Sequence, residues 1–387
     1  MKNYLTSESV CQGHPDKLCD YIADSILDAC LAVDRYSRVA CEVMATKGKI
    51  IVAGEITSNN RVYLPGIVRT ALGASGYDPK DFSISIHVHT QSPDIAAGVD
   101  TAIEVRETLS AAGELGAGDQ GIVYGYATNE THSGIPIPLE LSHRICRSLD
   151  DHRNFGTIRG IWSDGKAQVT VEYEDGIPKR IDTIIVSVQH TEDKYLDLLK
   201  NEIINLVIRP ACKELPIDAD TQILINPSGK FVEGGPAADT GLTGRKIMVD
   251  TYGGLARHGG GAFSGKDPTK VDRSGAYMAR FIAKHIIAAD LAERCEVSIS
   301  YAIGKADPVA ISVDTFGTGK HHDGDLTRVV QHTFAMRPTA IIDELSLRSP
   351  IYGHTAWYGH MGNSLYPWEH IFPAYLSALK GALHHDH

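Results

Sequence analysis

The sequence lacks the signals that would place it in a membrane or in an oxidising compartment. It contains no window of about 18 uncharged apolar residues, and its first residues, MKNYLTSESV, include no apolar core of a signal peptide. The seven cysteines are odd in number and form no C-x-x-C pair, which argues against a disulfide framework and against a zinc ribbon. We therefore predict a cytoplasmic protein with buried free thiols and no membrane partner.

Positive charge is also scarce. Lysine and arginine number 37 against 48 aspartates and glutamates, which gives a net charge of −11. Proteins that bind nucleic acid usually present a basic surface, so no nucleic-acid partner is expected. The composition, 43% hydrophobic and 22% charged, is typical of a globular enzyme, and 387 residues are enough for two or three domains.

Two common catalytic motifs are missing, and a third is incomplete. No G-x-S-x-G elbow and no H-E-x-x-H zinc motif occur. Residues 260–267, GGAFSGKD, have the spacing of a phosphate loop, with Gly260, Gly265 and Lys266 in place. The next residue should carry a hydroxyl for Mg²⁺, but it is Asp267. The stretch is either a damaged phosphate loop or another means of holding phosphate.

Helical and strand patterns alternate along the chain, which indicates an α/β (α+β) fold. In the helix predicted for residues 16–33, apolar residues share one broad face, while Asp20, Asp24 and Asp28 lie on the other. The patterns that support this fold class are helices at 16–33, 195–212 (stopped near Pro210) and 274–295, and strands at 49–56, 82–90, 168–176, 180–191 and 296–304. Three strand ends, IHVHTQSPD, VSVQHTED and ISYAIGKADP, are faintly alike and lie roughly a hundred residues apart, so either an internal threefold duplication or chance explains them.

Two possible roles remain open for each of four residues in the first third of the chain. His14 and Asp16, in GHPDK, either cap a helix or project together toward phosphate and Mg²⁺. Glu42 and Glu55 lie in otherwise apolar strands and either face solvent or require a cation. His87 and His89 share one face of a strand, but no third ligand follows at a typical spacing, so structural roles are favoured.

The stretch 225–274 is the richest in possible chemistry. Its many glycines alternate with cations and acids: Lys230, Arg245, Lys246, Lys266 and Lys270 among Asp239, Asp250, Asp267 and Asp272. Lysine and arginine suit a polyphosphate, carboxylates suit Mg²⁺, and glycine lets the backbone approach a ligand closely. The alternative is a solvated charged loop. Asp119, between glycines in GAGDQG, is either a turn former or an acid held against a ligand.

Taken together, these stretches resemble the S-adenosylmethionine synthetases (methionine adenosyltransferases). The similarity follows the family's order over nearly the whole chain, and GAGDQG and GGGAFSGKDP are its most specific parts. The segments that carry it are GHPDK (13–17), GEIT (54–57), QSPDIA (91–96), GAGDQG (116–121), GYATNE (125–130), GGPAADTGLTGRK (234–246), DTYGG (250–254) and GGGAFSGKDPTKVDRS (259–274).

The resemblance implies a reaction and a set of residues for it. The sulfur of methionine attacks C5′ of ATP, and the triphosphate that leaves is hydrolysed to phosphate and pyrophosphate. The implied catalytic residues are His14, Lys166, Arg245 and Lys266. ATP contacts are implied for His14, Asp164, Gly165, Lys166, Lys230, Phe231, Asp239, Arg245, Lys246, Ala262 and Lys266. Methionine contacts are implied for Glu55, Gln91, Asp119, Asp239 and Lys270, two Mg²⁺ ions for Asp16 and Asp272, and K⁺ for Glu42.

The same resemblance implies the architecture. Three similar domains with pseudo-threefold symmetry are expected, with mixed sheets packed with helices, over residues 1–100, 101–231 and 232–387. A gating loop is expected near 91–101. A homodimer or homotetramer with sites shared between subunits is the expected assembly. The chain departs from the family pattern at Gln12, Lys230 and Glu233, and it is shorter between Gly76 and Phe82.

The chemistry of this reaction needs no general base, since a thioether sulfur carries no proton to remove. Two rival functions are a phosphate-loop NTPase and a non-catalytic protein that binds S-adenosylmethionine. Asp267 argues against the first. The retained lysines and acids argue against the second, because a protein that binds only the product needs no triphosphate cage.

Overall fold

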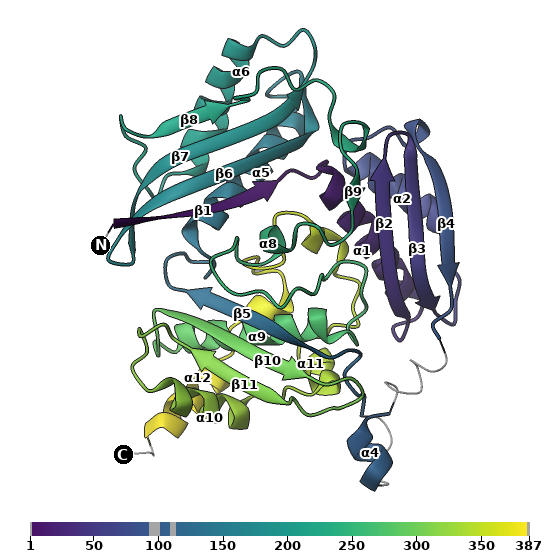
Figure 1. The fold of residues 1–387 in the computed structure, drawn as a ribbon, viewed down its shortest axis with the longest axis vertical. Coiled ribbons are helices and arrows are strands. Elements are labelled where there is room, and N and C mark those ends of the chain that lie inside the picture. Colours follow the sequence, from purple (N-terminus) through teal and green to yellow (C-terminus); the bar gives the residue numbers. More distant parts are fainter. Residues whose placement is uncertain (1, 93–100, 109–113, 385–387) are drawn as a thin grey trace.

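Three β-sheets packed with helices make up the chain in a computed structural model, which describes residues 2–92, 101–108 and 114–384. Figure 1 shows the sheets arranged around a central region of loops that contains α8 (Ile247–Asp250). The sheets have the orders β1-β6-β7-β8, β4-β3-β2-β9 and β11-β10-β5. This architecture confirms the predicted mixed α/β fold class.

The first sheet is antiparallel except for its last pair, β7 and β8, which are parallel. Its strands are β1 (Lys2–Val10), β6 (Ile161–Glu174), β7 (Ile177–His190) and β8 (Gln222–Ile225). Leu141, Ile145 and Leu149 of α5 (Ile137–Asn154) pack on the inward residues of β6 and β7 and form one hydrophobic core with them.

The second sheet lies beside the chain's first helix. Its strands are β4 (Ser83–His89), β3 (Lys49–Thr57), β2 (Arg38–Thr46) and β9 (Gly241–Leu242). Alternate residues of β2 and β3 are buried against α1 (Pro15–Val33) and α2 (Leu64–Ala74), as the period of a strand requires. The other face carries Ala40, Glu42 and Glu55, and it is part of the candidate site.

The third sheet packs on α9 (Val271–Ala288). Its strands are β11 (Ala310–Asp314), β10 (Arg294–Tyr301) and β5 (Gly121–Thr128), all antiparallel. The remaining elements are η1 (Pro79–Asp81), α4 (Ile103–Thr108), α6 (Leu196–Glu202), η2 (Ile203–Ile208), α7 (Arg209–Ala211), η3 (Gly235–Ala237), α10 (Asp323–Thr333), α11 (Pro338–Glu344), η4 (Gly353–Ala356), η5 (Pro367–Glu369) and α12 (Pro373–His384). Within the described residues, no helix combines the length and apolar character needed to cross a membrane.

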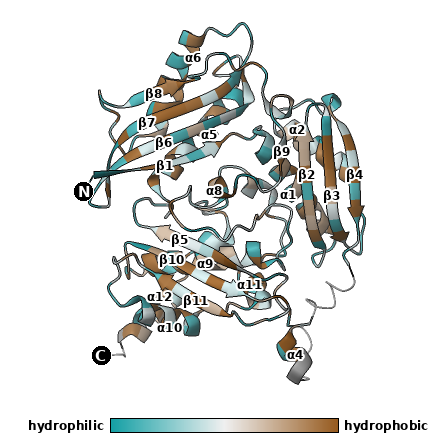
Figure 2. Cartoon of the chain, in the orientation of Figure 1, coloured by the Kyte–Doolittle hydropathy of each residue, from teal (hydrophilic) through white to brown (hydrophobic). Residues whose placement is uncertain are grey.

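Each sheet joins segments that are far apart in the sequence. β1 pairs with β6, β9 with β2, and β5 with β10, so every sheet draws strands from two of the three predicted segments. The three similar strand ends noted in the sequence belong to β4, β7 and β10, and each of these lies in a different sheet. Figure 2 shows hydrophobic residues concentrated in inner strands such as β3 and β7.

Two predicted helices differ from the observed ones. The helix predicted for 195–212 runs from α6 to α7 and ends at Ala211, but its middle, η2, is a wider π-helix. Pro210 has no N–H for the carbonyl of Leu206, and that oxygen lies 3.1 Å from the His152 ring nitrogen instead. The prediction for 274–295 was wrong at its end: the helix stops at Ala288, Asp290 has a φ of 59°, and Arg294 begins β10.

Gly125 sets the distance between β5 and α9. A Cβ atom at this position would lie 2.0 Å from the backbone carbon of Ala279. We expect Gly125→Ala to lower the free energy of unfolding by about 3 kcal/mol, because the helix backbone has to move away from the sheet. Chemical denaturation measures this, with Gly73→Ala as the control. Gly73 is an exposed residue in the last turn of α2 with no atom within 4 Å of the added carbon, and a similar loss there would contradict the prediction.

Candidate active site

The GHPDK stretch places two polar side chains at the start of α1. His14 is the N-cap, and its Nδ1 accepts a hydrogen bond from the Asp16 N–H at 3.2 Å, while Pro15 opens the helix. The Asp16 carboxylate accepts from the Leu242 N–H at 3.0 Å and from Lys246 Nζ at 2.8 Å, and Arg245 lies 3.8 Å away. Capping and projection into a charged site therefore occur together, so the two readings of this motif are compatible.

Protonation at this helix start follows from burial and from the adjoining lysine. Burial, reinforced by Lys246, lowers the pKa of His14 to about 3, so its imidazole is neutral at physiological pH. Because Nδ1 accepts the Asp16 N–H, the proton of the neutral ring lies on Nε2. Burial alone would raise the pKa of Asp16, but Lys246 and the Leu242 N–H outweigh it and hold that pKa below its usual value.

The start of β6 lies against this loop. Gly13 N–H donates to the Ser163 carbonyl at 3.0 Å, and Cys11 N–H donates to the Gly165 carbonyl at 2.9 Å. The Asp164 carboxylate accepts from the Gly235 N–H at 2.7 Å, and burial raises its pKa to about 6. We call His14, Asp16, Asp164, Gly165, Lys166, Asp239, Arg245 and Lys246 the helix-start set. Asp239 is exposed, and its charge acts on Asp164.

A cavity of about 260 Å³ lies beside the outer face of β2 and β3. Its walls come from β2, β3, the end of β4, the GAGDQG segment and the loop before α9. We call its lining residues the pocket set: Arg38, Ala40, Glu55, His89, Gln91, Ser92, Gly118, Asp119, Lys266, Lys270 and Asp272. This set contains every residue for which the resemblance implies a contact with the substrate methionine, except Asp239.

Pairing between β2 and β3 explains why Glu55, which lines the pocket, and Glu42, which does not, lie close together. Glu55 is opposite Ala40 on the outer face, and Glu42 is opposite Ala53, so the two glutamates are diagonal neighbours. Glu55 Oε1 lies 3.2 Å from His89 Nε2. Glu42 is exposed in the single chain. His87, also exposed, does not line the pocket, and no group of three metal-ligating side chains occurs among the described residues.

The GGAFSGKD stretch is not a phosphate loop of the usual form. No strand precedes it within 251–259, and the next helix begins only at Val271. The Asp267 carboxylate is fully buried, where it accepts the N–H groups of Val39 at 2.8 Å and Thr269 at 3.0 Å and pairs with Lys270. Burial opposes its ionisation, but Lys270 outweighs burial and lowers the pKa of Asp267. Asp267 therefore anchors the loop to β2 and does not replace the missing hydroxyl.

Lys266 takes its position from the same anchoring. The loop pairs with β2 through Cys41 N–H to the Gly265 carbonyl (2.9 Å) and Asp267 N–H to the Val39 carbonyl (3.0 Å). Lys266 Nζ then lies 2.6 Å from the Asp272 carboxylate. A basic and an acidic side chain thus face the cavity together.

The helix-start set and the pocket set adjoin through the glycine-rich loop. A Cβ atom on Gly261 would lie 2.3 Å from Cγ of Asp272, and one on Gly244 would lie 2.7 Å from Cβ of Ala262. Gly261 of the loop therefore lies against Asp272. The next residue, Ala262, lies against Gly244, which directly precedes Arg245. The ion pairs of Asp16 with Arg245 and Lys246 lie within the helix-start set, and the ion pair of Lys266 with Asp272 lies within the pocket set.

The departures from the family pattern are all accommodated locally. Lys230 forms an ion pair with Glu192, and Phe231 N–H donates to the His190 ring at 3.0 Å. Glu233 pairs with Lys47 at 2.8 Å, so its added negative charge is neutralised. Where the chain is shorter, the Tyr77 hydroxyl donates to the Gly13 carbonyl and supports the GHPDK loop. The Gln12 N–H donates to Asp150 at 3.0 Å.

Several residues of the site were not predicted from the sequence. Arg38 and Ala40 share a strand face with Glu42, which strand alternation alone could have indicated. Asp20 and Asp24, on the acidic face of the first helix, are fully buried beside loops: Asp20 accepts the Gly244 N–H at 2.8 Å, and Asp24 the Gly265 N–H at 2.8 Å. Most of the expected gating loop, residues 93–100, lies outside the described residues.

Comparisons with known proteins identify the family of this chain. Family models match the S-adenosylmethionine synthetase N-terminal domain at residues 2–96, the central domain at 114–231 and the C-terminal domain at 233–370. An S-adenosylmethionine synthase of Finegoldia magna is 52% identical over 373 residues, which cover 94% of this chain and 95% of that protein. Synthases of Clostridium botulinum and Desulforudis audaxviator are 49% and 51% identical, and each alignment covers 96% of this chain and 97% and 96% of the respective relative. The chain therefore belongs to the S-adenosylmethionine synthetase family, the methionine adenosyltransferases.

Proposed function

We propose that this chain makes S-adenosylmethionine by attack of the methionine sulfur on C5′ of ATP. The S–C5′ bond forms as the C5′–O bond breaks, triphosphate leaves with the electron pair, and water then cleaves it into phosphate and pyrophosphate. The observation that carries the proposal is a group of cationic side chains that adjoins, through the glycine-rich loop, a cavity lined by acids and lysines. A cytoplasmic location is part of the proposal.

The pocket set suits an amino acid. Glu55 and Asp119 offer carboxylates for the α-ammonium group, Lys270 offers an ammonium for the carboxylate, and Gln91 offers an amide. Part of the lining is apolar, including Ala40, and accepts the thioether. The cavity of about 260 Å³ is small enough to hold one amino acid close to its walls.

The helix-start set and Lys266 suit the triphosphate. Lys166, Arg245, Lys246 and Lys266 bring positive charge around the leaving oxygens before the bond breaks, and such prepared charge is usually a large part of catalysis. The neutral His14 can donate from Nε2 to the departing oxygen. Asp164, Gly165, Lys230, Phe231 and Ala262 are left to contact the nucleotide.

The residues present fit two Mg²⁺ ions as cofactors, and we also propose K⁺ at Glu42. Asp16 and Asp272 are carboxylates that each lie beside a lysine, and a lysine favours the binding of phosphate. Within the described residues, neither carboxylate belongs to a group of three metal-ligating side chains. This matches Mg²⁺, which usually takes one or two carboxylates and completes its shell with phosphate and water. When bound, the metal would offset the charge that builds on triphosphate. Exposed Glu42 would hold K⁺.

We also propose a homodimer or homotetramer with sites shared between subunits. The outer face of the second sheet, which leads to the pocket, carries part-exposed apolar residues such as Met44 and Ile51 beside Glu42. A second copy on this face would cover the apolar residues and enclose the pocket. Light scattering of the purified protein tests this, and a monomer at micromolar concentration would contradict it.

The reaction is tested by incubating the protein with ATP, methionine, Mg²⁺ and K⁺ and detecting S-adenosylmethionine by mass spectrometry. We expect product together with equal amounts of phosphate and pyrophosphate, and only when methionine is present. Release of phosphate and ADP without methionine would favour the rival phosphate-loop NTPase. Binding of S-adenosylmethionine in calorimetry without turnover would favour the non-catalytic rival.

Gly261 offers a test of the role of Asp272. We expect Gly261→Ala to raise the Mg²⁺ concentration for half-maximal activity at least about tenfold, because the new methyl group displaces the Asp272 carboxylate. A Mg²⁺ titration of activity measures this. Gly260→Ala is the matched control: its φ is +95° but no atom lies within 4 Å of the added carbon, so it strains the backbone without touching Asp272. Equal Mg²⁺ requirements in both variants would contradict the role of Asp272.

A further inference from the structure

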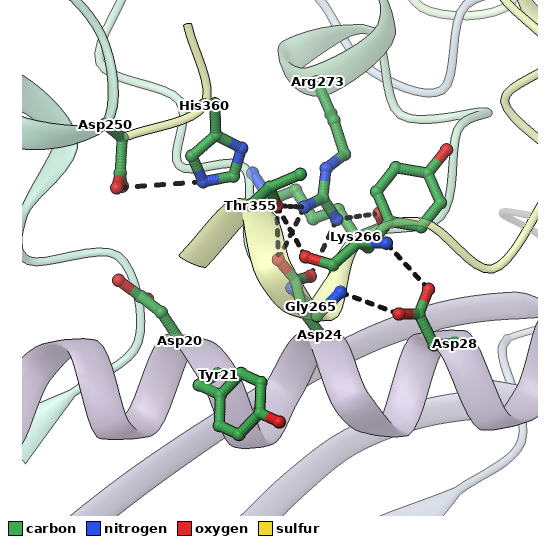
Figure 3. Close-up of polar contacts among 12 residues, drawn as sticks. Asp20, Tyr21, Asp24, Asp28, Asp250, Gly265, Lys266, Arg273, Thr355 and His360 are labelled. Carbon is green, nitrogen blue, oxygen red and sulfur yellow. Dashed lines mark hydrogen bonds and ion pairs between the residues drawn. The ribbon is translucent and has the colours of Figure 1, made fainter. Parts of the chain in front are cut away.

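A buried ion pair between α1 and α9 contacts the loop segment Gly265–Lys266. Arg273 Nη1 and Nη2 donate to the two carboxylate oxygens of Asp24 at 2.8 and 2.6 Å, and both side chains are fully buried. Figure 3 shows the pair with Gly265 and Lys266 beside it. The Arg273 guanidinium also lies 4.3 Å from the centre of the Tyr352 ring, so its plane is held by packing as well as by charge.

The pair holds one segment of the loop from two sides. The Gly265 N–H donates to Asp24 Oδ1 at 2.8 Å, while Arg273 Nη1 donates to the Lys266 carbonyl at 2.9 Å. Thus the chain immediately before and at Lys266 is bound by the same two side chains that bind each other. The direction in which the Lys266 side chain leaves the backbone depends on this arrangement.

The pair also joins the two helices that carry the proposed Mg²⁺ ligands. Asp24 lies eight residues after Asp16 on α1, roughly 12 Å along the helix axis. Arg273 directly follows Asp272 in the first turn of α9. Because a bidentate arginine–carboxylate pair permits little rotation, it fixes how the two helix starts lie relative to each other.

We propose that Asp24 and Arg273 are positioning residues for adenosyl transfer, which set Lys266, and through it the Lys266–Asp272 pair, in place without touching substrate. The proposal rests on the proposed function, in which Lys266 meets the triphosphate. Neither side chain reaches the cavity: both are fully buried, and neither is among its lining residues. Their effect on the reaction must therefore pass through the loop.

A purely structural role is the alternative, and the chain provides a matched control. Arg280, two turns further along α9, forms an equally buried bidentate pair with Glu369 at 2.9 Å and donates to the backbone carbonyls of Tyr126 and Gly134. It lies outside both sets of site residues. Arg273→Lys and Arg280→Lys each keep the positive charge and lose the planar fork.

The experiment compares these two variants with wild-type protein. Both are expected to lower the melting temperature by similar amounts. Only Arg273→Lys is expected to lower kcat for S-adenosylmethionine formation, by at least tenfold, with the KM for methionine within threefold of the wild type. Assays are run well below the melting temperature of both. A kcat for Arg273→Lys within threefold of that for Arg280→Lys would overturn the proposal. If Arg273→Lys does not fold, Asp24→Asn, which keeps an acceptor for the Gly265 N–H, takes its place in the same comparison.

A double-mutant cycle with Lys266→Met shows whether Arg273 acts through Lys266. If it does, adding Arg273→Lys to Lys266→Met costs less than threefold further in kcat, because the positioned group is already absent. Multiplicative losses would overturn the proposal. Failure of the proposed function gives different results: the wild-type protein then forms no product, or Lys266→Met by itself leaves kcat unchanged.

Discussion

Replacing Lys266 by methionine is expected to lower kcat for S-adenosylmethionine formation by about 10²–10³-fold. Lys266 lies where the cavity meets the glycine-rich loop, with its ammonium group 2.6 Å from Asp272. As the C5′–O bond breaks, negative charge builds on the triphosphate, and a cation already in place stabilises that charge without rearrangement. Methionine fills nearly the same volume, so the change removes the charge and largely preserves packing.

Steady-state kinetics with saturating ATP and methionine measure this effect. Lys320→Met is the control, since Lys320 is an exposed lysine that pairs with Asp290 on the surface. The control should retain wild-type kcat. The Lys266→Met variant should also hydrolyse added triphosphate slowly, because the same charges are needed in that step. A Lys266→Met variant with more than a tenth of the wild-type kcat would show that this cation does not stabilise the leaving group.

His14→Asn should slow adenosyl transfer by about 10²-fold. Asparagine is a good N-cap, and its side-chain oxygen can accept the Asp16 N–H as His14 Nδ1 does, so the helix start should survive. The change removes the Nε2–H, the group expected to donate to the departing oxygen. His14→Gln is the complement, because it extends a donor toward the Nε2 position and loses the cap; it should retain more activity than His14→Asn and melt at a lower temperature.

The pH dependence separates a hydrogen-bond donor from a proton donor. Burial lowers the pKa of His14 to about 3, so the imidazole stays neutral as pH rises from 5 to 9 and loses no proton in that range. We therefore expect the ratio of wild-type to His14→Asn kcat to stay constant between pH 6 and 9. A ratio that falls as pH rises through 6–7 would indicate that a protonated His14 acts as a general acid. Full activity in His14→Asn would remove His14 from the mechanism.

Much of the fold could be predicted because its local patterns are strong. The amphipathic helix at 16–33 and the alternating strand at 82–90 correspond to α1 and β4 within one or two residues. Local patterns did not indicate the places where tertiary contacts compensate for a disruption. Before Pro210, His152 binds the freed Leu206 carbonyl, and the helix widens before it ends at Ala211. The acids of α1 matched a solvent-facing pattern, but Arg273, Lys17 and loop N–H groups stabilise Asp24 and Asp20 inside the protein.

The site was predicted through its motifs, and the structure shows which motif residues meet. Glu55, Gln91, Asp119, Lys266, Lys270 and Asp272 line one cavity, although they come from four separate stretches. Asp16 and Asp272 lie in sets that adjoin through the glycine-rich loop, as the proposal of one triphosphate bound near both requires. No local pattern indicated the Asp24–Arg273 pair, since its two residues are 249 positions apart in the sequence and meet only in the folded chain.

The sequence by itself determined the family, the α/β elements and the inventory of basic and acidic side chains, because these depend on residue type and short spacing. Only the tertiary structure decided what Asp267 does. From the sequence it indicates either a damaged phosphate loop or another means of holding phosphate; in the fold it is a buried carboxylate that joins the loop to β2 and pairs with Lys270. A carboxylate is stable in such a place only when N–H groups and a cation surround it, and those partners come from strands and turns that meet only in the folded chain.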